Sequence, residues 1–79
     1  MSAPVGMLKN RSRRGMKELD VLLERWLARD LPQADDGTVA AYTRLLELQD
    51  PDLARYLLTG EAHADPAVAA VIARIRMAA

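Results

Sequence analysis

Apolar residues recur at helical spacing through most of this chain. The clearest stretch follows Gly15, where five large apolar residues fall at i, i+3, i+4, i+7 and i+8: Leu19, Leu22, Leu23, Trp26 and Leu27. Charged residues such as Glu24 and Arg25 occupy the opposite face, which is typical of an amphipathic helix with one buried stripe. The pattern predicts a helix from about Met16 that ends at Leu31-Pro32, because the residue before a proline is disfavoured in the α region.

The same spacing predicts three more helices in the second half of the chain. One covers about residues 38–49 after a loop at 33–37, a short one begins at Asp50-Pro51 and stops at Gly60, and the last begins at Asp65-Pro66. An Asp-Pro pair is a typical helix start, because the carboxylate can cap free N–H groups and proline fits the first turn. The residues expected on the buried faces of the two longer helices are Val39, Tyr42, Leu45, Leu46, Val68, Val71, Ile72 and Ile75.

The N-terminal end of the chain is less regular. Residues 1–7 have no hydrophobic period and predict a flexible tail, and a short helix at about residues 7–14 precedes Gly15. No strand pattern competes with the helices. The sequence therefore predicts an all-α fold, a small five-helix bundle, in a single helical domain at residues 8–79, since 79 residues suit one hydrophobic core.

Catalytic chemistry has few candidate groups in this sequence. There is no cysteine, and the single histidine, His63, lies in a loop without a helical partner that could share a metal ion, so we interpret it as a solvated side chain. Glycine-rich phosphate-binding motifs are absent. We therefore expect a protein that is not an enzyme and that binds no metal and no cofactor on its own.

Charge and hydropathy narrow the range of partners and locations. The net charge is zero, although residues 1–20 contain five basic and two acidic side chains. Zero net charge and the lack of an aromatic stacking surface near these basic residues argue against a nucleic-acid partner. The sequence has no apolar run long enough for membrane insertion and no secretory h-region, so we expect a cytoplasmic protein.

The junction around Gly15 allows two interpretations. Arg13 and Arg14 precede the glycine, and Glu18 and Asp20 follow it. In the structural interpretation, Gly15 ends a helix in a left-handed turn and the charged residues complement the dipoles of the two helix ends. In the functional interpretation, a glycine between opposite charges exposes backbone that a partner protein can approach closely.

Two motifs give the sequence a family resemblance. Residues 14–20 read R-G-M-K-E-L-D and match the R-G-x-x-E motif followed by a hydrophobic residue and aspartate. Residues 45–53 read L-L-E-L-Q-D-P-D-L, and Tyr56 and Gly60 follow at the matching distance. In both motifs and their order, the chain resembles the SdhE family, the bacterial relatives of succinate dehydrogenase assembly factor 2, over roughly residues 8–76.

The resemblance implies a five-helix fold and a role in flavoprotein assembly. Members of the family bind the flavoprotein subunit of succinate dehydrogenase, and often that of fumarate reductase, and promote covalent attachment of FAD without supplying a reacting atom. The resemblance makes Arg14, Gly15 and Glu18 the functional motif, and position 56 is a departure, with tyrosine where relatives commonly carry tryptophan. The partner-binding residues that we predict are Arg13, Arg14, Gly15, Glu18, Asp20, Asp50, Asp52 and Tyr56. We expect a monomer; an antitoxin-like regulator that binds a small membrane or cytoskeletal partner is the alternative.

Overall fold

The computed structural model describes residue 12 and residues 14–77, and this part of the chain is helical, without strands. Helix α2 (Lys17–Arg29) is followed by a short 3-10 helix, η1 (Leu31–Gln33), and by α3 (Asp36–Leu46). Helix α4 (Asp50–Ala54) continues directly into a π-helical turn, η2 (Arg55–Thr59), and α5 (Pro66–Met77) completes the fold. The prediction of an all-α fold is confirmed. The helix expected at residues 7–14 and the tail at 1–7 lie outside the described residues, apart from Ser12 and Arg14, so the count of five helices stays a prediction.

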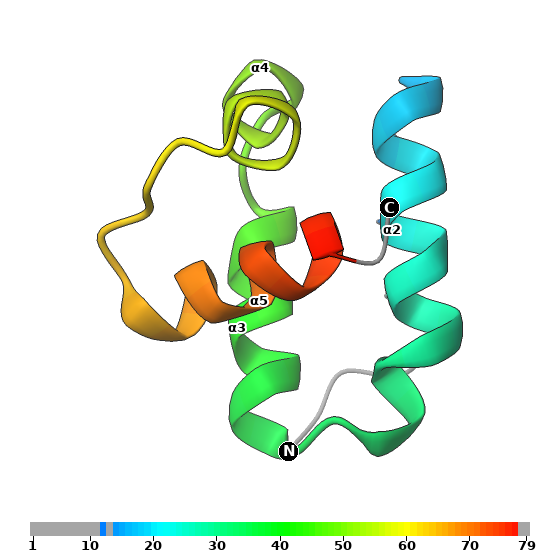
Figure 1. Ribbon diagram of the computed structural model, residues 1–79, viewed down its shortest axis with the longest axis vertical. Coiled ribbons are helices and arrows are strands. Elements are labelled where there is room, and N and C mark those ends of the chain that lie inside the picture. Colours follow the sequence, from blue (N-terminus) through cyan, green and yellow to red (C-terminus); the bar gives the residue numbers. More distant parts are fainter. Residues whose placement is uncertain (1–11, 13, 78–79) are drawn as a thin grey trace.

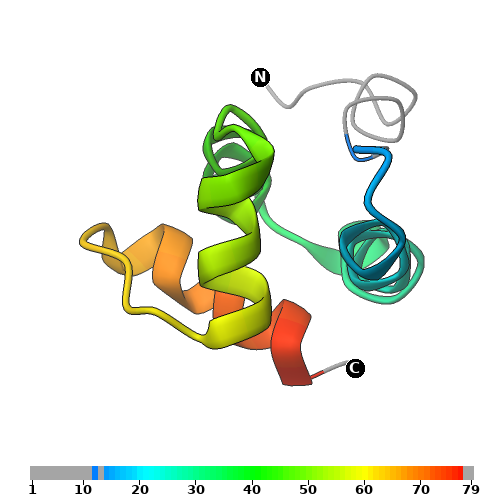
Figure 2. The same ribbon diagram turned by 90° about the horizontal axis from the view of Figure 1, so that it is seen from above.

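The helices surround one core. Helices α2 and α3 run in opposite directions, and α5 crosses them and packs against both (Figure 1). The π-helical turn η2 packs against α5, and seen from above it lies beside the C-terminal half of that helix (Figure 2). In Figure 1 the N-terminal end of α2 and the segment α4–η2 both lie above α5, so the start of α2 and η2 are on the same side of that helix.

The predicted apolar stripes form the core. Every residue expected on the buried faces of the helices is buried, including the five of α2 and the four of α5. Trp26 and Tyr42 stack at the centre, with ring centroids 4.1 Å apart and planes inclined by 15°. The hydroxyl of Tyr42 is hydrogen-bonded to Ser12 Oγ at 2.6 Å, and burial raises the pKa of Tyr42 to about 12. The segment before α2 is therefore attached to the core.

Capping residues and turns set the helix ends, and both predicted boundaries of α3 need correction. Asp35 Oδ1 accepts a hydrogen bond from the Thr38 amide at 2.8 Å, so α3 begins at Asp36. The predicted start at residue 38 was wrong by two residues, because Gly37 lies in the first turn of the helix and not in a loop. The same helix ends at Leu46 and not at residue 49. The predicted stop at Gly60 is confirmed, since its φ of +79° is left-handed.

The start of α5 follows the predicted capping chemistry. Asp65 Oδ1 accepts hydrogen bonds from the amides of Ala67 at 2.9 Å and Val68 at 3.5 Å. These bonds lower the pKa of Asp65 below its ordinary value. Thus one Asp-Pro pair caps its helix as expected; the other, at Asp50, is used differently.

Candidate partner-binding site

Arg14 connects the R-G-x-x-E motif to the rest of the fold. Its side chain is only 18% exposed, and its Nη2 donates hydrogen bonds to the carbonyl oxygens of Leu46 and Leu48, the latter at 2.9 Å. Leu46 is the last residue of α3, and Leu48 lies in the turn that follows. A guanidinium there satisfies carbonyls that have no partner within the helix and complements the negative end of its dipole. Arg14 thereby fixes the start of the motif onto the turn between α3 and α4.

Two carboxylates complete this cluster. Asp50 Oδ1 lies 3.7 Å from Arg14 Nε, and Asp20 Oδ1 accepts a hydrogen bond from the Arg14 amide at 2.7 Å. The prediction that Asp50 caps α4 was wrong. Gln49 occupies the N-cap position, the cap makes no side-chain hydrogen bond, and the Asp50 carboxylate instead pairs with the nearby guanidinium. Three of the predicted site residues, from both motifs, are therefore in one place.

Gly15 lies at the exposed end of this cluster. Its φ is +82°, a left-handed conformation that side chains other than glycine adopt at a cost, so the predicted left-handed turn is confirmed. Apart from its two chain neighbours, no heavy atom of the described residues lies within 4 Å of a Cβ built on Gly15. The backbone conformation therefore favours glycine here, and the described residues leave space around it.

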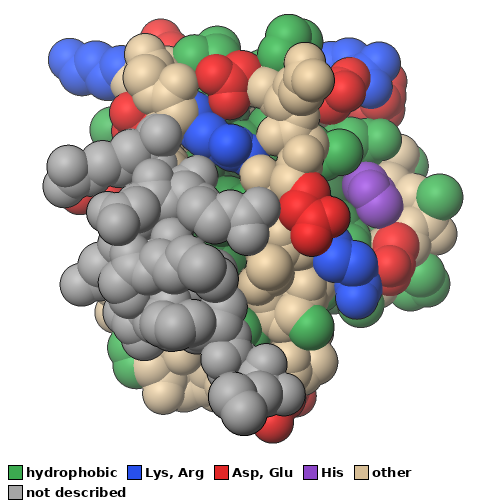
Figure 3. All heavy atoms as spheres, turned by 180° about the vertical axis from the view of Figure 1, so that it is seen from behind, with side chains coloured by type: hydrophobic (Ala, Val, Ile, Leu, Met, Phe, Trp, Pro, Cys, Tyr) green, Lys and Arg blue, Asp and Glu red, His purple; other side chains and the backbone are tan. Residues whose placement is uncertain are grey.

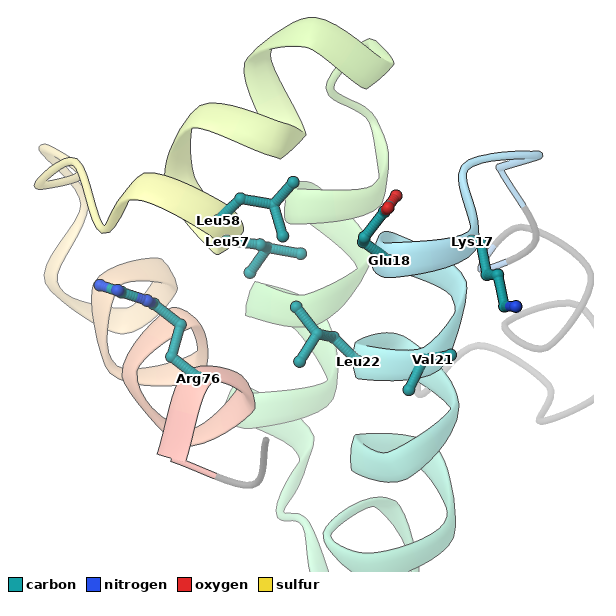
Figure 4. A pocket seen from close by; sticks show the side chains of 7 residues that line it. All are labelled: Lys17, Glu18, Val21, Leu22, Leu57, Leu58 and Arg76. Atoms are coloured by element: carbon teal, nitrogen blue, oxygen red, sulfur yellow. The ribbon is translucent and has the colours of Figure 1, made fainter.

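Glu18 is exposed in the first turn of α2, and within the described residues no hydrogen bond or ion pair engages its carboxylate. It lies beside a groove of about 670 Å³ between α2, η2 and α5 (Figure 4). Leu22, Leu57 and Leu58 point toward one another in this groove, and Lys17 points away from it. The residues that line the groove are Lys17, Glu18, Val21, Leu22, Leu57, Leu58 and Arg76.

Asp52 and Tyr56 belong to a different cluster. Asp52 Oδ1 pairs with Arg55 Nη2 at 2.9 Å, and the ring of Tyr56 lies against that of His63 with centroids 4.9 Å apart. His63 is half-buried, and its Nδ1 accepts a hydrogen bond from the Asp65 amide at 3.0 Å. It is therefore part of the packing of the loop, and its interpretation as a solvated side chain was wrong. Within the described residues no hydrogen bond, ion pair or ring contact joins Asp52 or Tyr56 to Arg14, and Arg13 lies outside those residues.

The groove was missed by the sequence analysis. The sequence contains only a weak signal for it, because Val21 lies off the apolar stripe of α2 and nothing distinguishes Leu58 from Leu57. In the structure Leu57 is buried and Leu58 is exposed. Isolated exposed apolar residues are common in proteins and identify a site only when the fold brings them together.

The described residues lack two features that would suggest other kinds of protein, a metal-binding cluster and a membrane-spanning helix. The described residues contain no group of three histidine, cysteine, aspartate or glutamate side chains that could hold a metal ion. In the same part of the chain no helix has the length and apolar character to cross a membrane. Among the described residues, basic and acidic side chains are mixed on the face seen in Figure 3. The described residues thus form a small helical fold that presents an exposed glycine turn and a groove nearby.

Comparison with known proteins identifies the family. Residues 7–79 match the family described as Sdh5, flavinator of succinate dehydrogenase, and the chain belongs to that family. It is 39% identical to the FAD assembly factor SdhE of Xylella fastidiosa (strain 9a5c) over 74 residues, which cover 94% of this chain and 76% of the relative. It is 48% identical to the SdhE of Methylococcus capsulatus over 65 residues, 81% of this chain and 77% of the relative. No solved structure was found to match. The family resemblance drawn from the two motifs is confirmed.

Proposed function

We propose that this protein is an assembly factor that binds the flavoprotein subunit of succinate dehydrogenase and promotes covalent attachment of FAD to it. The observation that carries the proposal is the family match over residues 7–79, together with relatives named as FAD assembly factors. Their names favour this function over that of an antitoxin-like regulator. The chain is not an enzyme in its own right, because the groups that react are those of the client and its flavin.

The factor would act by orientation. Attachment of FAD needs the flavin and the accepting side chain of the client in a reactive arrangement, and a bound protein can stabilise the client conformation that provides it. The exposed turn at Gly15 and the carboxylate of Glu18 would contact the client. Arg14, Asp20 and Asp50 would hold that turn in place from within the fold.

Several finer points belong to the same proposal. We include the flavoprotein subunit of fumarate reductase as a second client, and we expect a cytoplasmic monomer that binds no FAD on its own. Arg13, Asp52 and Tyr56 are proposed as further contacts around the central turn. The family resemblance also supports the count of five helices.

Flavin attachment in cells tests the function. The client subunit is expressed in a strain that lacks this gene, with or without the factor, and covalent flavin is measured by its fluorescence in a denaturing gel. We expect Gly15→Arg and Glu18→Ala to lower the signal. Glu24→Ala is the control, because Glu24 lies in α2 like Glu18, and we expect it to leave the signal at the wild-type level. Equal signals with and without the factor would refute the function. A normal signal from both Gly15→Arg and Glu18→Ala would refute only the contact surface.

A further inference from the structure

The groove beside Glu18 gathers exposed apolar side chains. Three large hydrophobic residues are exposed within the described part of the chain: Val21 at 38%, Leu58 at 42% and Met77 at 78%. Two of the three, Val21 and Leu58, line this one groove, although they are 37 positions apart in sequence. Exposed apolar residues that the fold brings together are typical of surfaces that bind another protein.

The wall that holds Leu58 has an unusual backbone. Leu57 and Leu58 belong to the single π-helical turn η2, which ends at the left-handed Gly60. Leu57 is 2% exposed and contributes to the core, while Leu58 remains at the surface. Single π-helical turns are rare and are frequently found at functional sites. The turn therefore places Leu57 in the core and leaves Leu58 exposed in the groove.

The charges around the groove leave one carboxylate available. Arg76 lines the groove, but its guanidinium lies over the backbone of Gly60, so close that a Cβ on that glycine would overlap it. In Figure 4 the guanidinium of Arg76 points away from the leucines, and Lys17 points to the other side of α2. Glu18 stands at the edge of the groove, with its carboxylate pointing away from Leu22 (Figure 4), and it has no cationic partner within the described residues.

We propose that this groove receives an apolar side chain of the flavoprotein client, and that a neighbouring lysine or arginine of the client pairs with Glu18. The proposal rests on the proposed function and extends it to Val21 and Leu58, which lie outside both sequence motifs. Two observations favour the client as the occupant. The groove includes Glu18 of the R-G-x-x-E motif. The Glu18 carboxylate, unpaired within the described residues, complements a basic side chain of the client, and the aliphatic stem of that side chain can cover the leucines of the groove.

Binding measurements with purified proteins test the apolar part. Calorimetric titration of the full chain into the flavoprotein subunit, prepared without covalent flavin, compares Leu58→Asp and Val21→Asp with Met77→Asp. Met77 is a matched control, because it is exposed and apolar but does not line the groove. We expect a charge in the groove to raise the Kd about tenfold or more, as for other apolar anchors of interfaces, and Met77→Asp to change it less than about twofold. Circular dichroism of each variant is the check that it is folded.

The charged part has its own control. Glu18→Gln keeps the size of the side chain and removes its charge, and Glu24→Gln does the same elsewhere on α2. We expect the wild-type Kd to rise with added salt, and the rise to be smaller for Glu18→Gln than for Glu24→Gln, because salt screens an ion pair.

The outcomes separate this proposal from the proposed function. If Leu58→Asp, Val21→Asp and Glu18→Gln bind as the wild type does, the groove is not the contact, and the function stands. If the wild-type factor does not bind the flavoprotein, both proposals fail. If sedimentation shows a wild-type dimer that Leu58→Asp dissociates while client binding is unchanged, a second copy fills the groove and the proposal is overturned.

Discussion

Replacement of Arg14 by alanine tests whether the arginine of the motif acts within the fold or on the partner. The guanidinium is largely buried and donates two hydrogen bonds to carbonyl oxygens at the end of α3. We expect Arg14→Ala to destabilise the domain strongly, because it removes the contact between the segment before α2 and the turn that joins α3 to α4.

The magnitude follows from the two hydrogen bonds. A hydrogen bond to a charged group contributes about 1.5–3 kcal/mol when well buried, and water can partly replace these two after truncation, so a loss of about 2–3 kcal/mol is expected. The ion pair with Asp50 adds little, since its atoms are 3.7 Å apart and the Asp50 side chain is 37% exposed. A domain of this size has about 4–12 kcal/mol of stability in total. The corresponding decrease in Tm is about 10–20 °C.

Thermal unfolding followed by circular dichroism measures this effect. Arg25→Ala is the control, because Arg25 is exposed on α2, and its loss should change the stability by less than about 0.5 kcal/mol. Affinity for the flavoprotein is measured well below the Tm of each variant. We expect folded Arg14→Ala to bind the flavoprotein more weakly but not to lose binding, because the turn at Gly15 is less well held while Gly15 and Glu18 are still present.

Equal Tm values for Arg14→Ala and Arg25→Ala would refute this account of the arginine. A loss of affinity in a variant of unchanged stability would mean that Arg14 contacts the client directly. The structural role assigned to its hydrogen bonds would then be wrong.

Three further predictions concern the backbone and the titratable groups. Gly15→Ala should cost about 1 kcal/mol, measured by urea unfolding, because φ is +82° and the space for a methyl group is open; no loss would mean that the turn rearranges freely. Because the pKa of Tyr42 is raised to about 12 in the folded state, the stability that its neutral form provides should be fully present below about pH 10 and be lost between about pH 10 and 12, and Tyr42→Phe should remove most of that fall in urea titrations. The pKa of Asp65 is lowered, so the stability that it provides should be present above about pH 4 and be lost as the pH falls below that value; Tm profiles of Asp65→Ala should show a weaker dependence on acid, and an identical dependence would contradict this.

Hydrophobic periodicity predicted the helices and the core. The five apolar residues of α2 and the four of α5 are buried as their spacing required. Periodicity gave both ends of α3 less well, because the cap at Asp35 and the turn after Leu46 depend on local hydrogen bonds that a hydrophobic pattern does not contain.

The candidate site was only partly predictable. The motif identified Arg14, but its hydrogen-bond partners are 32 and 34 residues away, and nothing in the sequence pairs a given arginine with given backbone carbonyls. The capping role predicted for Asp50 failed for the same reason, since the nearby guanidinium is visible only in the folded chain. Likewise, Val21 and Leu58 become one surface only after α2 and η2 pack around α5.

The contact of Arg14 with the turn after α3 has a consequence for when the factor can recognise its client. Segments distant in sequence must be in place before the guanidinium reaches the carbonyls of Leu46 and Leu48, so the orientation of Gly15 depends on the completed tertiary structure. A newly synthesised or partly unfolded copy has the same motif in its sequence, but its Arg14 is not hydrogen-bonded to Leu46 and Leu48. If the turn at Gly15 is the contact surface, as we propose, competence to engage the flavoprotein is coupled to cooperative folding, and we expect incompletely folded copies not to compete for the client.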